Sequence, residues 1–251
     1  MSSRAFFEYL LRLGDDRLVL GHRLSEWCGH GPILEEDIAL ANISLDLIGE
    51  ASLLLKLAAS VEDEGRNEDT LAYFRDAIEF RNALMLELPK GDFGFTIMRQ
   101  FLFSVFSALQ MDALQKSRNA GLGGIAAKAL KETRYHVRHS AQWVVTLGVG
   151  TEESHTRAQR ALDELWRYTG ELFAANDVDR EVAASGDGVD PSTLEPAWRE
   201  QVMPVLDRAG LQVADAGYMQ RGGREGRHTE HLGHMLSEMQ ILARSHPGAS
   251  W

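Results

Sequence analysis

The sequence predicts an all-α fold in which long helices pack as a bundle. Only 6 of the 251 residues are proline, and none lies between Pro32 and Pro89 or between Pro89 and Pro191. Long segments rich in alanine, leucine and glutamate place apolar residues three and four positions apart, which is the spacing of one helix face. No segment shows the alternation of apolar and polar residues that is typical of a strand.

The composition fits one helical domain spanning residues 1–251. A hydrophobic content of 44% supplies a core, and the net charge of −11 argues against a generic nucleic-acid or anionic-membrane surface. Cys28 is the only cysteine, so no internal disulfide can form. The first eleven residues include Arg4 and Glu8 and lack the apolar core of a cleavable signal. We therefore expect a cytoplasmic protein.

Residues 38–59 form the most apolar segment of the chain. Asp46, Glu50 and Lys56 interrupt it, and charged residues are costly inside a bilayer. We therefore expect a core helix here and no membrane span.

The first half of the chain predicts four helices. The first runs from about residue 6 to residue 27, with an inward stripe of Leu10, Leu13, Leu20 and Leu24. The second begins near Leu34, where acidic residues suit the positive end of a helix. The third and fourth are expected over residues 69–88 and 96–116, and the fourth is apolar enough to be a central core helix.

The second half of the chain predicts four more helices, over residues 125–147, 152–175, 196–209 and 228–244. A polar connector is expected near residues 176–196 and a loop over residues 210–226. The glycine-rich stretches at 121–124 and 222–223 are expected to be turns. Neither has the preceding strand or the lysine of a phosphate-binding loop.

Long antiparallel helices with short glycine-containing joints predict a four-helix bundle with additional C-terminal helices. The connection between the second helix and the 96–116 helix is long enough to cross the bundle, and this crossover indicates a ferritin-like topology.

Bundles of this type can hold a carboxylate-bridged di-iron site whose ligands have a known spacing. One Glu or Asp comes from each of two helices, and a Glu-x-x-His comes from each of the other two. In the second helix this motif falls on Asp46 and Gly49, and in the 125–147 helix it falls on Glu132 and Tyr135. Both carboxylates are present, and both histidines are missing.

The other two ligand positions follow from the depth of Asp46 along its helix. On the first helix this depth points to Asp15 or Asp16, with Asp16 as the candidate, and on the 96–116 helix it falls at residues 103–106, which include no carboxylate. Carboxylates without imidazole make a poor iron site. We therefore predict that Asp16, Asp46, Gly49, Glu132 and Tyr135 are vestigial positions. The chain is expected to hold no metal, no cofactor and no catalytic residue.

Asp46 and Glu132 then need another partner, because an isolated charge inside a bundle is costly. Arg23, Lys128 or His136 could supply a salt bridge.

A shifted ligand set is the alternative. Glu132 with His136, or His136 with His139, has helical spacing that could still hold a metal. A further cluster consists of His228, Glu230, His231 and His234. One helical turn supplies too few metal ligands, so we interpret this cluster as a polar helix start with capping and interface roles.

Several sequence blocks, taken in order, resemble one family over essentially the whole chain: the C subunit of the ring-1,2-phenylacetyl-CoA epoxidase, a multicomponent bacterial monooxygenase of phenylacetate degradation. The blocks are Arg12-Leu13-Gly14-Asp15, Glu26-Trp27-Cys28-Gly29-His30, Ala39-Leu40-Ala41-Asn42-Ile43, Leu45-Asp46-Leu47, Arg134-Tyr135-His136, Leu165-Trp166-Arg167 and His228-Thr229-Glu230-His231-Leu232-Gly233.

This resemblance implies a ferritin-like subunit without catalytic activity of its own. It implies pairing with a homologous A subunit that carries the di-iron centre, and completion of the complex by a B subunit and a reductase. Purified alone, such a chain could form a homo-oligomer through the face that its partner normally covers. The alternative remains an active di-iron carboxylate oxygenase with the shifted ligand set.

Overall fold

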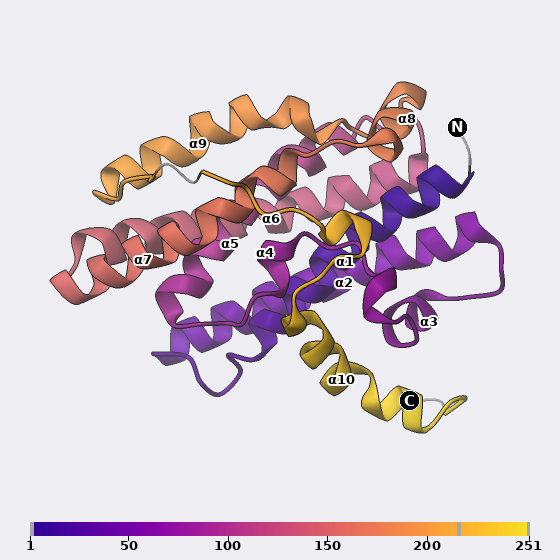
Figure 1. Cartoon of the computed structure of the whole chain (residues 1–251), viewed down its shortest axis with the longest axis horizontal. Coiled ribbons are helices and arrows are strands. Elements are labelled where there is room, and N and C mark those ends of the chain that lie inside the picture. Colours follow the sequence, from indigo (N-terminus) through magenta and orange to yellow (C-terminus); the bar gives the residue numbers. More distant parts are fainter. Residues whose placement is uncertain (1–2, 215–216, 250–251) are drawn as a thin grey trace.

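Four long helices form the centre of the molecule. The computed structural model describes residues 3–214 and 217–249, which contain helices and no strands. The bundle consists of α1 (Ser3–Ser25), α2 (Leu34–Glu62), α5 (Phe93–Leu114) and α6 (Ala120–Val149). Helix α1 packs along α2, α5 packs along α6, and α2 also contacts α6 (Figure 1). The all-α, ferritin-like prediction is confirmed.

Shorter elements surround this bundle. Between α2 and α5 lie α3 (Glu68–Tyr73), η1 (Ala77–Glu79) and α4 (Leu84–Glu87). After α6 come α7 (Glu152–Thr169), η2 (Gly170–Phe173), α8 (Asp177–Ser185), η3 (Pro191–Leu194), α9 (Glu195–Arg208), η4 (Gly223–Glu225) and α10 (Glu230–Ser245). Helices α7 and α9 pack on α5 and α6, whereas α10 contacts α3 and η1 and projects from the side of the bundle (Figure 1).

Helix α5 is the central core helix that its composition predicts. Its aromatic residues Phe101, Phe103 and Phe106 are buried, and the backbone carbonyl of Leu102 accepts a 2.9 Å hydrogen bond from the indole of buried Trp198. Such a bond satisfies the one polar atom of an otherwise apolar side chain. The packing of α9 on α5 is thereby fixed in register.

Helix α2 is apolar on its outer as well as its inner side. By length and composition alone it is apolar enough to cross a membrane. Its inner residues Ile43, Leu47 and Leu54 are buried in the bundle core, and Glu50 is buried beside them. Its inner face is therefore that of a core helix.

The helix expected over residues 69–88 is broken, and the prediction of one continuous helix is wrong. Its backbone donors are taken by carboxylates of α1: Asp15 accepts from the amide of Arg81 and Asp16 from the amide of Ala83, both at 2.8 Å. A helix amide that bonds to a distant side chain cannot also continue the i to i−4 ladder. Tertiary contacts therefore override the local helix signal.

One further expectation at a helix boundary is wrong. The glycine-rich stretch 121–124 is not a turn but the first turns of α6, because Asn119 caps that helix by accepting a 3.0 Å bond from the amide of Leu122. The connector near 176–196 contains α8 and η3, and Asn176 begins α8 with a capping box.

The expected turn at 222–223 is confirmed. Gly222 has φ of +148°, and a Cβ on Gly223 would lie 2.0 Å from the carbonyl oxygen of Asn82. Only glycine permits this close approach of the two backbones.

Candidate functional site

An arginine lies in the interior of the bundle at the depth where the sequence pointed to a metal site. Arg17 of α1 is fully buried and donates from Nε to Glu50 Oε2 of α2 at 2.7 Å. Its Nη2 donates to Ser107 Oγ of α5 at 2.9 Å, and its Nη1 donates to the Leu13 carbonyl at 3.0 Å. Three of the four bundle helices thus meet at one guanidinium.

The fourth helix contributes a histidine beside this pair. His136 of α6 is buried, and its Nε2 lies 3.0 Å from Asp46 Oδ2. One turn further along, His139 Nε2 lies 2.8 Å from Glu36 Oε2. The seam between α2 and α6 is therefore crossed by two histidine–carboxylate pairs.

The electrostatics of the interior centre on Glu50. Burial raises the pKa of its carboxyl group, and the Arg17 guanidinium and, more weakly, His136 act to lower it. Its second oxygen, Oε1, has no hydrogen-bond partner. The Arg17 guanidinium is thus the principal compensation for a carboxylate in a low-dielectric core.

None of the five predicted vestigial positions bonds to the Arg17–Glu50 pair itself. Gly49 is exposed, and Tyr135 is 40% exposed with its ring stacked on that of His139 at 5.9 Å. Glu132 and Asp46 are partly exposed beside the seam. Asp16 is buried on another side of α1, where it pairs with Arg224 at 2.7 Å. The predicted register, with Gly49 and Tyr135 on the inner face, is wrong.

A periodic signal for the correct residues was present in the sequence. Arg17 completes the stripe of Leu10, Leu13, Leu20 and Leu24, and Glu50 lies on the same face of its helix as Leu47 and Leu54. One apolar stripe thus contains a positive residue and the other contains a negative residue at the same depth in the bundle. This pattern indicates a buried ion pair.

Of the three partners proposed for Asp46 and Glu132, His136 is confirmed for Asp46. Arg23 instead bonds to Glu26 at 2.7 Å and to the backbone carbonyl of Glu87. It therefore ties the end of α1 to α4.

The interior residues do not fit a di-iron centre. Arg17 offers only hydrogen-bond donors, and its positive charge would repel a metal cation in the same space. His136 and His139 are each directed at their own carboxylate on α2 and not at a common point. In residues 3–214 and 217–249 no group of three or more His, Cys, Asp or Glu side chains could hold a metal ion.

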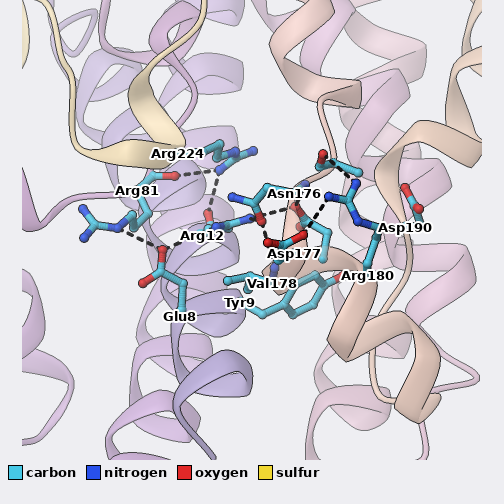
Figure 2. A network of polar contacts seen from close by, with 12 residues as sticks. Glu8, Tyr9, Arg12, Arg81, Asn176, Asp177, Val178, Arg180, Asp190 and Arg224 are labelled. Carbon is cyan, nitrogen blue, oxygen red and sulfur yellow. Dashed lines mark hydrogen bonds and ion pairs between the residues drawn. The ribbon is translucent and has the colours of Figure 1, made fainter. Parts of the chain in front are cut away.

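A second polar network lies on the flank of α1 and joins this helix to neighbouring segments. Arg12 donates to Asn176 Oδ1 at 3.0 Å and to Asp179 Oδ2 at 2.8 Å, which holds α8 against α1 (Figure 2). Glu8 accepts from Arg81 at 3.1 Å on the other side. Arg12, Glu8, Arg81 and Asp179 each have a protein partner, and Arg12 Nε is the one nitrogen of that guanidinium without a hydrogen bond.

The histidine-rich cluster at the start of α10 is divided among separate partners. His228 pairs with buried Glu87 at 2.7 Å, and the backbone carbonyl of His231 accepts from Arg23 at 3.0 Å. These contacts join the start of α10 and the residues just before it to the rest of the chain.

Comparisons with known proteins agree with this architecture. The model of a family described as phenylacetic acid catabolic protein matches residues 1–251. The chain is 48% identical over 243 residues to the C subunit of 1,2-phenylacetyl-CoA epoxidase from Escherichia coli (strain K12), and the match covers 97% of this chain and 98% of that protein.

Proposed function

Because the chain belongs to the family of phenylacetic acid catabolic proteins, we propose that it is a structural, non-catalytic subunit of a multicomponent 1,2-phenylacetyl-CoA epoxidase. In this proposal the di-iron centre and the epoxidation of the aromatic ring belong to an A subunit. This chain supports that subunit, and a small B subunit and a reductase complete the complex. The complex would work in the cytoplasm.

The observation that carries the proposal is the Arg17–Glu50 ion pair inside the bundle. A di-iron oxygenase needs four carboxylates and two imidazoles directed at one point, with space left for oxygen and substrate. Here that depth is filled by a guanidinium with bonds to three helices. Such an arrangement joins three helices through hydrogen bonds and offers no open coordination position.

The iron content of the chain tests the proposal. The purified chain and a purified A subunit are each incubated anaerobically with ferrous iron, desalted and measured by elemental analysis. We expect far less than one iron per chain here and about two per chain in the A subunit, as the ligand count of such sites requires. About two irons in this chain would overturn the proposal in favour of the shifted ligand set at His136 and His139.

Complex formation is the second test. The chain is expected to co-purify with the A subunit, and epoxidation of phenylacetyl-CoA is expected only when the A subunit is present. Failure of the two chains to associate would remove the subunit role.

A further inference from the structure

The outer face of α2 carries a stripe of exposed apolar side chains. Leu34, Ile38 and Leu45 are 72%, 51% and 66% exposed. Together with Ala41 and Ile48, which are partly exposed, they follow one another at alternating spacings of four and three residues. This is the spacing of a seam that a second helix covers.

Two small residues follow on the exposed side of α2. Gly49 and Ser52 are exposed, and a Cβ built on Gly49 would meet nothing within 4 Å. Small residues in a helix seam let another helix approach closely, because backbone then faces backbone.

The neighbouring helix α6 presents an exposed row of unpaired cations. Lys128, Lys131 and Arg138 are exposed and form no ion pair with any residue that the structure describes. Arg134 of the same helix lies 3.9 Å from Asp112 of α5. Lys56 of α2 is exposed as well.

Several exposed arginines on other helices are paired within one turn. Arg157 pairs with Glu153 on α7, Arg180 with Asp177 on α8, and Arg199 with Glu195 on α9. On a chain of net charge −11 the unpaired positive row on α6 stands apart from these local pairs. Unpaired charge of one sign on one face is the pattern that electrostatic complementarity to a partner requires.

Tyr135 lies on the same helix as the cationic row and contacts a histidine that is bound to α2. Its ring stacks on His139, which is bound to Glu36 of α2, and the guanidinium carbon of Arg138 lies 5.4 Å from the ring centroid. The ring is thus held in place from both sides while 40% of the residue is exposed. Rigid, partly exposed tyrosines of this kind are common anchors in interfaces.

We propose that the outer faces of α2 and α6 form one docking surface for the A subunit of the epoxidase, which lays an apolar helix along Leu34, Ile38 and Leu45 and directs carboxylates at Lys128, Lys131 and Arg138. This inference rests on the proposed function. It adds which face of this chain binds the A subunit and which charge the A subunit presents to it.

The dimensions of the surface suit a stable interface. Helix α2 has 29 residues and is about 43 Å long at 1.5 Å per residue. Two neighbouring helix faces of that length and about 10 Å width each together present on the order of 850 Å², close to the roughly 800 Å² per partner of a standard interface.

The test measures the affinity of the full-length chain for the purified A subunit at two salt concentrations. The double variant Lys131→Glu/Arg138→Glu is expected to bind at least about tenfold more weakly and to show a reduced dependence on salt. Leu45→Arg, which places a charge in the seam, is expected to weaken binding at least as much. The matched control is Arg157→Glu/Arg160→Glu on α7, which changes the net charge equally and is expected to bind like the unaltered chain.

The outcomes separate this inference from the proposed function. If the unaltered chain binds no epoxidase subunit, the proposed function fails. If it binds and the α6 and seam variants bind as tightly as the α7 control, the docking surface is refuted while the subunit role stands. The docking surface is also refuted if the α6 and seam variants still bind the A subunit but lose self-association or binding to anionic lipid vesicles. Circular dichroism and urea unfolding verify that the variants remain folded.

Discussion

Two arginines of the same bundle are both fully buried, yet their surroundings are opposite. Arg17 donates from all three of its nitrogens and faces the carboxylate of Glu50. Arg99 of α5 donates only from Nη1, to the carbonyls of Leu88 at 2.5 Å and Pro89 at 3.3 Å, and its Nε and Nη2 have no partner. Burial, with a contribution from neighbouring Arg23, lowers the pKa of Arg99 to about 9.

The difference is that only Arg17 is paired with a buried carboxylate. An arginine beside a carboxylate compensates a charge that would otherwise be isolated, so both partners depend on each other. Arg99 donates hydrogen bonds only to carbonyls, and its guanidinium carbon lies 5.7 Å from the centroid of the Phe95 ring. Glu26 raises the pKa of Arg99 without a hydrogen bond to it, so no directly bound carboxylate offsets the desolvation cost. The middle of the bundle is therefore electrostatically matched across three helices, whereas its end near residues 88–89 is not.

The largest expected effect is the loss of one partner from the matched pair. Arg17→Met leaves Glu50 buried without a counter-charge and should lower the free energy of unfolding by about 3–5 kcal/mol. The double variant Arg17→Met/Glu50→Leu removes both charges at similar volume and should recover most of that loss, because an apolar replacement of a buried ion pair is often neutral or stabilising.

Urea unfolding followed by circular dichroism measures all three proteins. A double variant as unstable as Arg17→Met would contradict the interpretation of an ion pair, since it would assign the loss to packing alone. Unchanged far-ultraviolet spectra are needed to show that the bundle is intact in each case.

A smaller effect is expected when the same substitution is made at the unmatched position. Arg99→Met removes a buried charge that faces no carboxylate, so relief of desolvation offsets the lost bonds to two carbonyls. We expect a protein as stable as the unaltered chain or about 1 kcal/mol more stable. The same urea titration checks it, and a loss as large as that of Arg17→Met would remove the contrast between the two sites.

The sequence predicted the architecture better than the register of the interior. The three- and four-residue spacing located the bundle helices α1, α2, α5 and α6 because each buries a continuous apolar stripe. Depth along the helix pointed to Asp16, one residue from Arg17, but one residue turns a side chain by about 100°. The apolar stripe of Leu13 and Leu20 shows which side chains of this helix point into the bundle, whereas the position along the helix axis does not.

The break in the helix expected over residues 69–88 could not be predicted from local sequence. The donors of residues 81 and 83 are taken by Asp15 and Asp16, which lie more than sixty positions earlier in the chain. Helix propensity reports only on neighbours along the chain, so a competing acceptor from another helix is invisible to it.

The smallest expected effect comes from a buried cation whose charge depends on pH. His228 lies between Glu87 Oε2, 2.7 Å from Nδ1, and the carbonyl of Phe80, 3.0 Å from Nε2. Both ring nitrogens face acceptors, so only the doubly protonated ring satisfies both. Burial lowers the pKa of His228, but the hydrogen bond and charge of Glu87, the bond to the Phe80 carbonyl and the charge of Asp15 together outweigh it. The net shift of the pKa is a rise above the ordinary 6.5.

A pKa that is raised in the folded state stabilises the fold below pH 6.5, and this contribution disappears as the pH rises through the folded value. The difference in unfolding free energy between the unaltered chain and His228→Gln should therefore be largest near pH 6 and shrink towards pH 9. Urea titrations across this range measure it, and His234→Gln, at an exposed position on α10, serves as the control. A difference that stays constant with pH would mean that His228 is neutral in the fold and that Glu87 is compensated by its neutral donors, Asn82 and the amide of Thr229.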